Sequence, residues 1–294
     1  MVRNMIVDCH THIENITGEN VANEHLTAVE TVDACIVLAT SDGPSNEVNK
    51  KLSEYVTKYN EKMVGFSVIR PDEDKISTSS LESATLKLGL KGLVLYCSDW
   101  GIHPTNSRNM RLYESALELA LPVFFHNAGV DIKQNAVLDY AQPYLLDEVA
   151  REFPSLKFVI GNMGAPFIEQ TLIMVAKHQN VYADLTIKPK NIWQTYNTVI
   201  AAYEYNVMDK LLFGSGFPTY NAGQCIETLL GFNMQLADTN LPAVPRVSIK
   251  SIIERDTLPI LGIKETKSNS PEKDIQKDKQ EDTEQKSKKP KKKD

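Results

Sequence analysis

Cysteine pairs and long apolar runs are both missing from this sequence of 294 residues. Its four cysteines (Cys9, Cys35, Cys97 and Cys225) lie far apart, and none belongs to a Cys-x-x-Cys motif. This spacing argues against a disulfide scaffold and suits reduced thiols. No apolar run approaches the roughly 20 residues that a membrane-spanning helix needs, and no charged-then-apolar signal segment precedes the first apolar run. We therefore expect a cytoplasmic protein that does not cross a membrane.

Apolar residues are almost absent from the last thirty positions. Residues 265–294 contain ten lysines, eight acidic residues, one isoleucine and no aromatic residue. A segment of this kind buries too little apolar surface to offset the entropy of ordering it. We predict a folded domain over residues 1–263 and a disordered, lysine-rich tail over 264–294. The thirty residues carry a net charge of +2 and the whole chain −6, so the residues before them carry −8. An acidic body argues against nucleic-acid binding by the folded domain.

Deletion of residues 265–294 is expected to leave the melting temperature within a few degrees of the full-length value, because nothing there can pack against a core. Six lysines between Lys286 and Lys293 would allow transient contact with polyanions, and a solvated tail is the alternative. Thermal denaturation of the two forms tests the expectation. A large fall in melting temperature would show that the tail docks on the folded domain.

Eight short apolar runs recur at intervals of about 30 residues, the length of one strand–helix unit. They span residues 5–7, 34–39, 63–69, 92–96, 122–125, 157–160, 181–185 and 211–213. Runs that are apolar throughout are typical of parallel strands covered on both faces. Eight such units within residues 1–263 predict a (β/α)8 TIM barrel, which belongs to the α/β class. A doubly wound open sheet is the alternative fold.

Three histidines stand where predicted strands end. His10 and His12 follow the first strand, and because they are two residues apart on an extended chain, their imidazoles point the same way. His126 ends the fifth strand. Barrel enzymes keep their chemistry at the carboxyl ends of the strands, and three imidazoles with a water form a known catalytic zinc arrangement. We predict one divalent ion, preferably Zn²⁺, bound by His10, His12 and His126. The alternative is a triad held by hydrogen bonds without metal.

Taken in order, these motifs resemble the metal-dependent amidohydrolase superfamily, in its amidohydrolase-related branch of TIM-barrel hydrolases. The resemblance covers the whole body of the chain and involves six of the predicted strands. The matching segments are residues 8–12 (DCHTH), 90–93 (LKGL), 122–126 (PVFFH), 158–164 (FVIGNMG), 180–184 (NVYAD) and 211–218 (LLFGSGFP). The resemblance implies a barrel with a metal site and hydrolytic chemistry.

The sequence departs from the family pattern at two positions. Gly216 stands where the family has the aspartate of strand eight, which implies that a metal ligand and proton acceptor is missing. Asn162 stands where the family has the histidine of strand six, which implies a position that contacts metal or substrate; we therefore assign Asn162 to substrate binding. We expect that Gly216→Asp would tighten metal binding, provided that the backbone there accepts a side chain.

The resemblance leads to two hypotheses about function. The leading one is a metal-dependent hydrolase of a small molecule, which acts through a water bound to the histidine-held metal; a decarboxylase-like lyase of the same branch is its variant. The rival is a barrel that has lost catalysis and serves as a ligand-binding or scaffold protein, which the departures at Gly216 and Asn162 favour. A small-molecule partner is expected in either case, and a homo-oligomer is compatible with both.

Further polar residues near the strand ends are candidates for the site. Asp184 ends the seventh strand and could replace the missing base, or hold a neighbouring histidine. His103 is a second catalytic candidate and Asp99 a substrate-binding one, both in a long polar loop after the fourth strand that could equally be solvated. Arg70 follows the third strand and could bind a substrate carboxylate or phosphate, or simply face solvent.

Three other residues near these motifs are interpreted as structural. Asp8 is expected to point away from the two histidines of the first strand or to lie below them, depending on the register. Cys9 has no histidine partner that would mark a thiol nucleophile, so we expect a small buried residue. His25 is expected on the surface.

Overall fold

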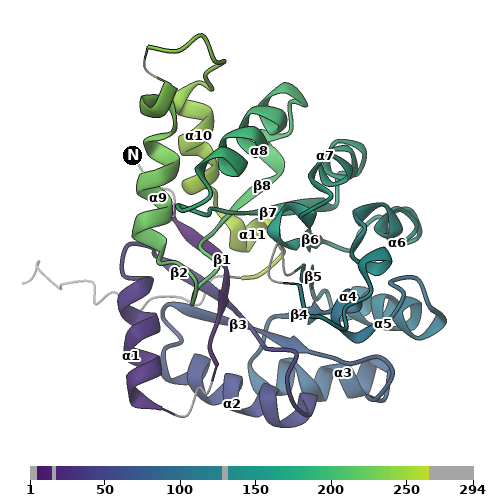
Figure 1. The fold of residues 1–294 in the computed structure, drawn as a ribbon. Coiled ribbons are helices and arrows are strands. Elements are labelled where there is room, and N and C mark those ends of the chain that lie inside the picture. Colours follow the sequence, from purple (N-terminus) through teal and green to yellow (C-terminus); the bar gives the residue numbers. More distant parts are fainter. Residues whose placement is uncertain (1–4, 15–17, 128–131, 237, 265–294) are drawn as a thin grey trace, which may run out of the picture.

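The strands form one parallel sheet of eight in the order of the sequence (Figure 1). The computed structural model describes residues 5–14, 18–127, 132–236 and 238–264. The strands are β1 Val7–His12, β2 Ala34–Leu38, β3 Met63–Val68, β4 Gly92–Leu95, β5 Val123–Phe125, β6 Phe158–Ile160, β7 Val181–Thr186 and β8 Leu211–Gly214. Each of the eight apolar runs became a strand, so the predicted barrel is confirmed.

The last strand returns to the first, which excludes the open sheet. Thr11 of β1 forms a parallel bridge with Phe217, just beyond β8. The His12 amide donates to the Phe217 carbonyl at 2.9 Å, and the Gly216 amide donates to the His10 carbonyl at 2.9 Å. Backbone groups of His10 and His12 therefore close the barrel, where the carboxyl ends of β1 and β8 meet.

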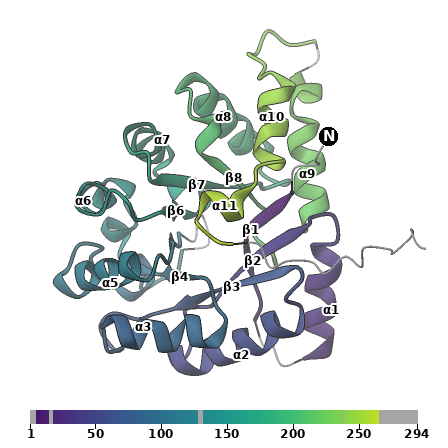
Figure 2. The ribbon, with the colours of Figure 1, turned by 180° about the vertical axis from the view of Figure 1, so that it is seen from behind.

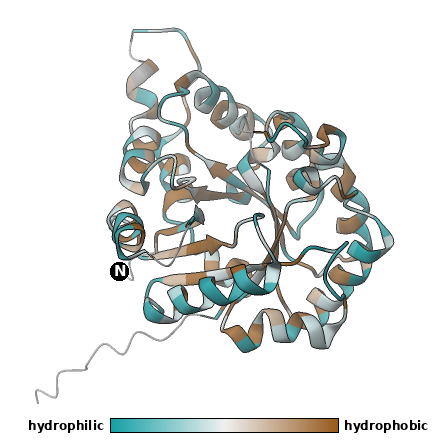
Figure 3. Ribbon diagram, turned by 60° about the horizontal axis from the view of Figure 1, so that its bottom comes forward, coloured by the Kyte–Doolittle hydropathy of each residue, from teal (hydrophilic) through white to brown (hydrophobic). Residues whose placement is uncertain are grey.

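Helices surround the barrel (Figure 1), and hydrophobic and hydrophilic residues alternate along several of them (Figure 3). The α-helices are α1 Glu19–Ala28, α2 Ser45–Lys58, α3 Thr78–Ala84, α4 Cys97–Trp100, α5 Ser107–Glu118, α6 Asp147–Glu152, α7 Ile168–Lys177, α8 Ile192–Glu204, α9 Ala222–Leu230, α10 Arg246–Ile253 and α11 Thr257–Ile260. Short 3₁₀ helices are η1 Leu86–Leu88, η2 Leu138–Ala141, η3 Pro143–Leu146, η4 Gly161–Gly164, η5 Met208–Lys210 and η6 Phe232–Leu236. The polar loop predicted after the fourth strand is in part the one-turn helix α4, so that prediction was only partly correct.

Helix α5 shows how the sequence sets these elements. Its cap residue Asn106 accepts hydrogen bonds from the amides of Arg108 and Asn109, which would otherwise lack partners at a helix start. Leu112 and Ala116, four residues apart, are fully buried against the barrel. Capping and an apolar stripe together determine where this helix begins and which side it buries.

The chain closes the opposite end of the barrel after α10. Arg255, between α10 and α11, donates to the carbonyls of Met208 and Leu211 at 3.1 and 2.9 Å, where β8 begins. Helix α11 consequently lies at the amino ends of the strands, across the barrel in the rear view (Figure 2). Within the described part of the chain, no helix is long and apolar enough to cross a membrane. The predicted disorder of 264–294 falls outside the described residues, apart from Lys264.

Candidate metal centre

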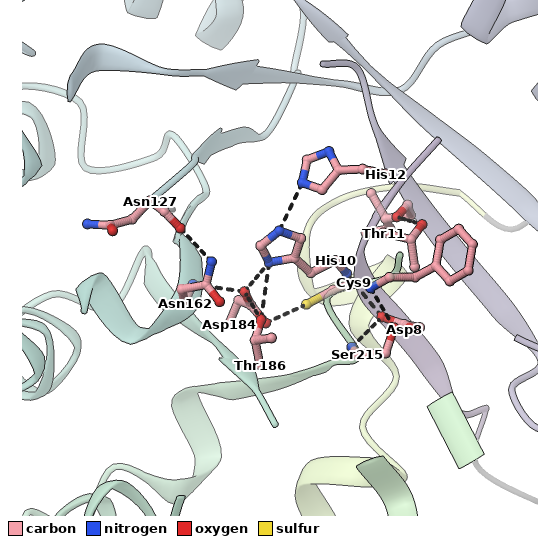
Figure 4. A network of polar contacts seen from close by, with 12 residues as sticks. Asp8, Cys9, His10, Thr11, His12, Asn127, Asn162, Asp184, Thr186 and Ser215 are labelled. Carbon is pink, nitrogen blue, oxygen red and sulfur yellow. Dashed lines mark hydrogen bonds and ion pairs between the residues drawn. The ribbon is translucent and has the colours of Figure 1, made fainter. Parts of the chain in front are cut away.

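His10 and His12 point into the barrel from β1, as their spacing predicts (Figure 4). Their Nε2 atoms lie 3.0 Å apart. Thr11, between them, points the other way, and its hydroxyl donates to the Ile36 carbonyl of the neighbouring strand at 2.9 Å. The alternation of a strand thus places both imidazoles on one side and fixes the strand from the other.

His126 joins them from the end of β5. Its ring centroid lies 5.3 Å from that of His10 and 5.0 Å from that of His12. Its amide donates to the Leu95 carbonyl of β4 at 2.8 Å, and the Tyr96 ring lies 4.5 Å from the His126 ring. The three potential ligand atoms all lie within 4.8 Å of one another, so residues more than a hundred positions apart meet at one point.

Asp184 fixes the orientation of the His10 ring. Its Oδ2 lies 2.5 Å from His10 Nδ1 and also accepts from the Asn162 amide at 2.9 Å and the Thr186 hydroxyl at 2.7 Å. Asp184 is fully buried, and its Oδ1 faces the Cys9 thiol at 3.8 Å. With Nδ1 of His10 assigned as the donor to Asp184, the ring turns Nε2 towards the other histidines. Of the two predicted roles for Asp184, these contacts match the one that holds a neighbouring histidine.

His12 and His126 lie where a charged imidazolium is unfavourable. Nδ1 of His12 lies 3.2 Å from the Leu38 carbonyl, which leaves Nε2 for the centre of the triad. Burial, followed by the neighbouring His10, lowers the pKa of His12 to about 3. Burial, with His12 and His10, also puts the pKa of His126 well below its usual value. Both rings are therefore neutral at pH 7, which is the form that binds metal.

The residues present fit a divalent metal ion. Two nitrogens about 2.0–2.1 Å from a tetrahedral Zn²⁺ lie about 3.3–3.4 Å apart, close to the 3.0 Å between His10 Nε2 and His12 Nε2. In addition, Nδ1 of His126 is buried and has no hydrogen-bond partner among the described residues. Buried polar atoms rarely lack a partner. Imidazole ligands suit zinc better than manganese, which prefers oxygen ligands.

Asn162 lies beside the triad in an unusual backbone conformation. Asn162 and Met163 have φ of +48° and +53°, within the turn η4 that follows β6. This turn directs the backbone amide of Asn162 at Asp184. The side-chain amide of Asn162 donates to the Asn127 carbonyl at 2.5 Å (Figure 4). Asn162 also lines the cavity described below, which is compatible with the predicted contact to substrate.

The structure bears on the condition attached to Gly216→Asp, that the backbone there accepts a side chain. Its φ is +70°, a left-handed conformation, and a Cβ atom added there would lie 2.7 Å from the Thr186 Cγ2 methyl. Contacts below 3.0 Å require a neighbour to move. A side chain at position 216 would therefore be strained, and the Thr186 methyl group would have to move or be removed.

A cavity of about 410 Å³ opens over the three histidines at the carboxyl ends of the strands. Its lining residues come from the carboxyl ends of strands and from the segments that follow them. They are His10, His12, Glu14, Thr40, Ser41, Asp42, Tyr96, Asp99, His126, Lys133, Asn162, Thr186, Lys188, Asn191, Gly216, Phe217, Pro218, Thr219 and Tyr220. A cavity of this size suits a small molecule.

The cavity includes one of the three loop candidates and not the other two. Asp99 lines it, and its side chain is 10% exposed. Arg70 is outside the lining and forms ion pairs with Asp72 and Glu73 at 3.1 and 3.2 Å. His103 is also outside, with Nδ1 accepting from its own loop. The structure therefore does not bring Arg70 or His103 to the histidines.

Two cavity lysines were missed by the sequence analysis. Lys133 and Lys188 both line the cavity. Lys188 follows the seventh strand by two residues, so its position could have identified it. Lys133 lies several residues beyond the fifth strand, and no local pattern marks it.

Asp8, which we expected to be structural, connects β1 to the end of β8. Its Oδ1 accepts hydrogen bonds from the backbone amides of His10 and Ser215 at 3.2 and 2.9 Å.

The expectation that His25 lies on the surface was wrong. His25 is fully buried, and its Nδ1 lies 2.8 Å from the Tyr55 hydroxyl. The ring also packs 4.8 Å from Phe217. Helix α1 turns this residue inward, although its neighbours in the sequence are mostly polar.

A buried neutral histidine makes stability depend on pH. Burial, followed by Lys62, lowers the pKa of His25 to about 4, whereas an unfolded histidine has a pKa near 6.5. A depressed histidine pKa gives stability that is present above about pH 6.5 and is lost as pH falls towards 4. Between pH 7.5 and 5.0, we expect wild type to lose about 2 kcal/mol more than His25→Gln. Denaturant unfolding at both values measures the difference, and equal losses would contradict it.

Comparison with known proteins places this site in a family. A family model described as amidohydrolase matches residues 7–233, which include all three histidines. The chain belongs to the amidohydrolase family. No curated protein matches the sequence. The family assignment agrees with the resemblance inferred from the strand-end motifs.

Solved structures share the barrel of this chain at low identity. A protein from Acinetobacter baumannii described as a "probable 2-pyrone-4,6-dicarboxylic acid hydrolase", with citric acid bound, is 15% identical, with 88% of this chain and 99% of that one covered and a TM-score of 0.62. The 5-carboxyvanillate decarboxylase of Novosphingobium aromaticivorans, with manganese and 4-hydroxy-3-methoxy-5-nitrobenzoic acid, is 11% identical (88% and 96% covered, TM-score 0.62). A 2,6-dihydroxybenzoate decarboxylase with 2,6-dihydroxybenzoate is 12% identical (88% and 100% covered, TM-score 0.60). These likenesses show the fold.

Proposed function

We propose that this amidohydrolase-family protein is a metal-dependent hydrolase that acts on a small carboxylated molecule. The observation that carries the proposal is the convergence of His10, His12 and His126, with their ligand atoms within 4.8 Å of one another at the base of a cavity. The donor set favours Zn²⁺, and the manganese of the related decarboxylase makes Mn²⁺ the alternative.

Two of the three histidines are oriented towards the ion by a partner on Nδ1. Asp184 holds His10 through Nδ1, and the Leu38 carbonyl holds His12 through Nδ1, so both rings present Nε2. Such partners fix ring orientation and increase ligand basicity. A bound divalent ion would polarise a substrate oxygen and lower the pKa of a coordinated water towards about 7. Three neutral ligands leave its charge uncompensated at close range, which favours an anionic substrate.

The residues around the triad would orient the substrate and manage its protons. Asn162 and Thr186 line the cavity next to His10. Asp184 is enclosed and has three donors on Oδ2, so it serves to position His10 and not to accept a substrate proton. Asp99 is the carboxylate of the described lining that is both partly buried and close to a lysine. It is the residue to which we assign proton transfer.

Decarboxylation is the second candidate, because two of the similar structures are decarboxylases of aromatic acids. The same metal and the same preference for an acid would serve either reaction. Gly216 favours the third interpretation, a binding protein without catalysis, since it offers no carboxylate to the centre. The two reactions give different products, and a binding protein gives none.

A panel of carboxylated lactones, carboxylated esters and aromatic acids tests the choice. We expect the zinc-loaded protein to hydrolyse a lactone or ester, EDTA to abolish turnover, and His126→Ala to be inactive. Mass spectrometry distinguishes the outcomes, because hydrolysis adds one water and decarboxylation loses carbon dioxide. Binding of the acids without either product would contradict the hydrolase proposal and support the binding protein.

A further inference from the structure

The Lys133 ammonium group connects segments that follow three different strands at the mouth of the cavity. Its Nζ donates to the Ser41 hydroxyl and to Asp42 Oδ1, both at 2.9 Å, in the loop after β2. Asp99, which follows β4, lies 3.9 Å away through Oδ2. All four side chains line the cavity that contains the histidine triad.

The two carboxylates near Lys133 differ in their exposure to water. The Asp42 side chain is 81% exposed and that of Lys133 is 41% exposed. Such a surface ion pair contributes little, because water competes with it. The Asp99 side chain is only 10% exposed. Burial raises the pKa of Asp99 and Lys133 opposes that rise, so the Asp99 carboxylate is stabilised by the lysine.

These differences decide which contact an incoming anion would replace. A carboxylate entering the cavity would compete with the weak, hydrated partner Asp42, and not with the enclosed Asp99. A lysine has three N–H donors, and two of them have hydrogen-bond partners among the described residues, Ser41 and Asp42. The ammonium group could therefore bind a new anion while losing only its weak, hydrated contact with Asp42.

We propose that Lys133 is the anion anchor of this cavity: it exchanges Asp42 for the carboxylate of the ligand, while Asp99 keeps the ammonium directed inward. The proposal rests on the proposed function for the class of ligand, a small carboxylate, but not for the metal. Lys133 acts as a specificity residue, which selects anions over neutral molecules of the same shape.

Binding of benzoate and of its neutral analogue benzamide tests the proposal. Calorimetry or ligand-observed NMR on the full chain is done twice, with zinc and with EDTA. Since a hydrogen bond to a charged group contributes about 1.5–3 kcal/mol, Lys133→Met should weaken benzoate binding by about 10- to 100-fold and leave benzamide unchanged. Asp42→Asn should strengthen benzoate binding by up to about 5-fold, because the competing carboxylate is gone.

Two matched variants separate this exchange from a general effect of charge. Lys188→Met removes the other cavity lysine, and Glu14→Gln neutralises another exposed carboxylate of the lining. The proposal is overturned if wild type binds no benzoate in the millimolar range, if Lys188→Met weakens binding as much as Lys133→Met, or if Glu14→Gln strengthens it as much as Asp42→Asn. Metal content of the same samples reports on the proposed function separately, since the Lys133 effect is expected with EDTA as well.

Discussion

Asp184→Asn is expected to lower the affinity of the histidine triad for Zn²⁺ by about 10- to 100-fold, the usual cost of losing the partner of a ligating histidine. The substitution keeps the size of the side chain but removes the charge that faces His10 Nδ1 at 2.5 Å. An asparagine oxygen can still accept from the Asn162 amide and the Thr186 hydroxyl, so the fold should persist. Affinity is measured by competition with a zinc chelator of known strength.

The control for this prediction is Asp209→Asn, the same chemical change at an exposed residue of the 3₁₀ helix η5. It should leave zinc affinity unchanged. If Asp184→Asn binds zinc as tightly as wild type while both variants unfold normally, the carboxylate does not support a metal-ligating His10. In that case the contact between Asp184 and His10 has only a structural role.

The second large effect concerns Gly216, the position where the resemblance to the family implies a missing carboxylate. Gly216→Asp alone is expected to destabilise the protein by about 1–3 kcal/mol, because φ is positive and its Cβ meets Thr186 Cγ2. Thr186→Ser removes that methyl and keeps the hydroxyl that donates to Asp184. In this background, Gly216→Asp should fold more normally and bind Zn²⁺ about 10- to 100-fold more tightly than wild type. The added carboxylate ligand increases the affinity, and residual backbone strain reduces that gain.

Thr186→Ser alone is the matched control for the double variant, and it should bind zinc like wild type. Denaturant unfolding comes first, so that affinity is compared only among folded proteins. A folded double variant with unchanged zinc affinity would show that an aspartate at 216 does not reach the ion. A wild type that turns over substrate well, with activity lost in the double variant, would show that Gly216 makes room for the ligand.

Periodicity was sufficient to predict the barrel, because parallel strands buried on both faces must be apolar throughout. The histidine triad was also predictable, since the carboxyl ends of all eight strands meet at one end of a barrel. Asp184 could be placed near the triad for the same reason. Sequence alone did not separate its two predicted roles, and its contacts with His10 and with the backbone amide of Asn162 are those expected of the role that holds a histidine.

Features that depend on loops and on backbone angles were not predictable in this way. Lys133 reaches the cavity from a loop whose course no residue pattern encodes, and its partners come from the loop after β2 and from helix α4. The positive φ of Gly216 is compatible with the sequence but not required by it. His25 was misjudged because its partners, Tyr55 and Phe217, come from distant segments. Local sequence does not report such long-range packing.

The central claim is that three histidines from β1 and β5 hold one divalent ion. Elemental analysis of protein produced in medium supplemented with both zinc and manganese tests it most directly, with His126→Ala purified in parallel. We expect about one zinc per wild-type chain, and at least about 100-fold weaker binding after His126→Ala, since each ligand of a zinc site contributes roughly 3 kcal/mol. Wild-type protein that is free of metal would contradict the claim. So would a His126→Ala variant that retains as much metal as wild type.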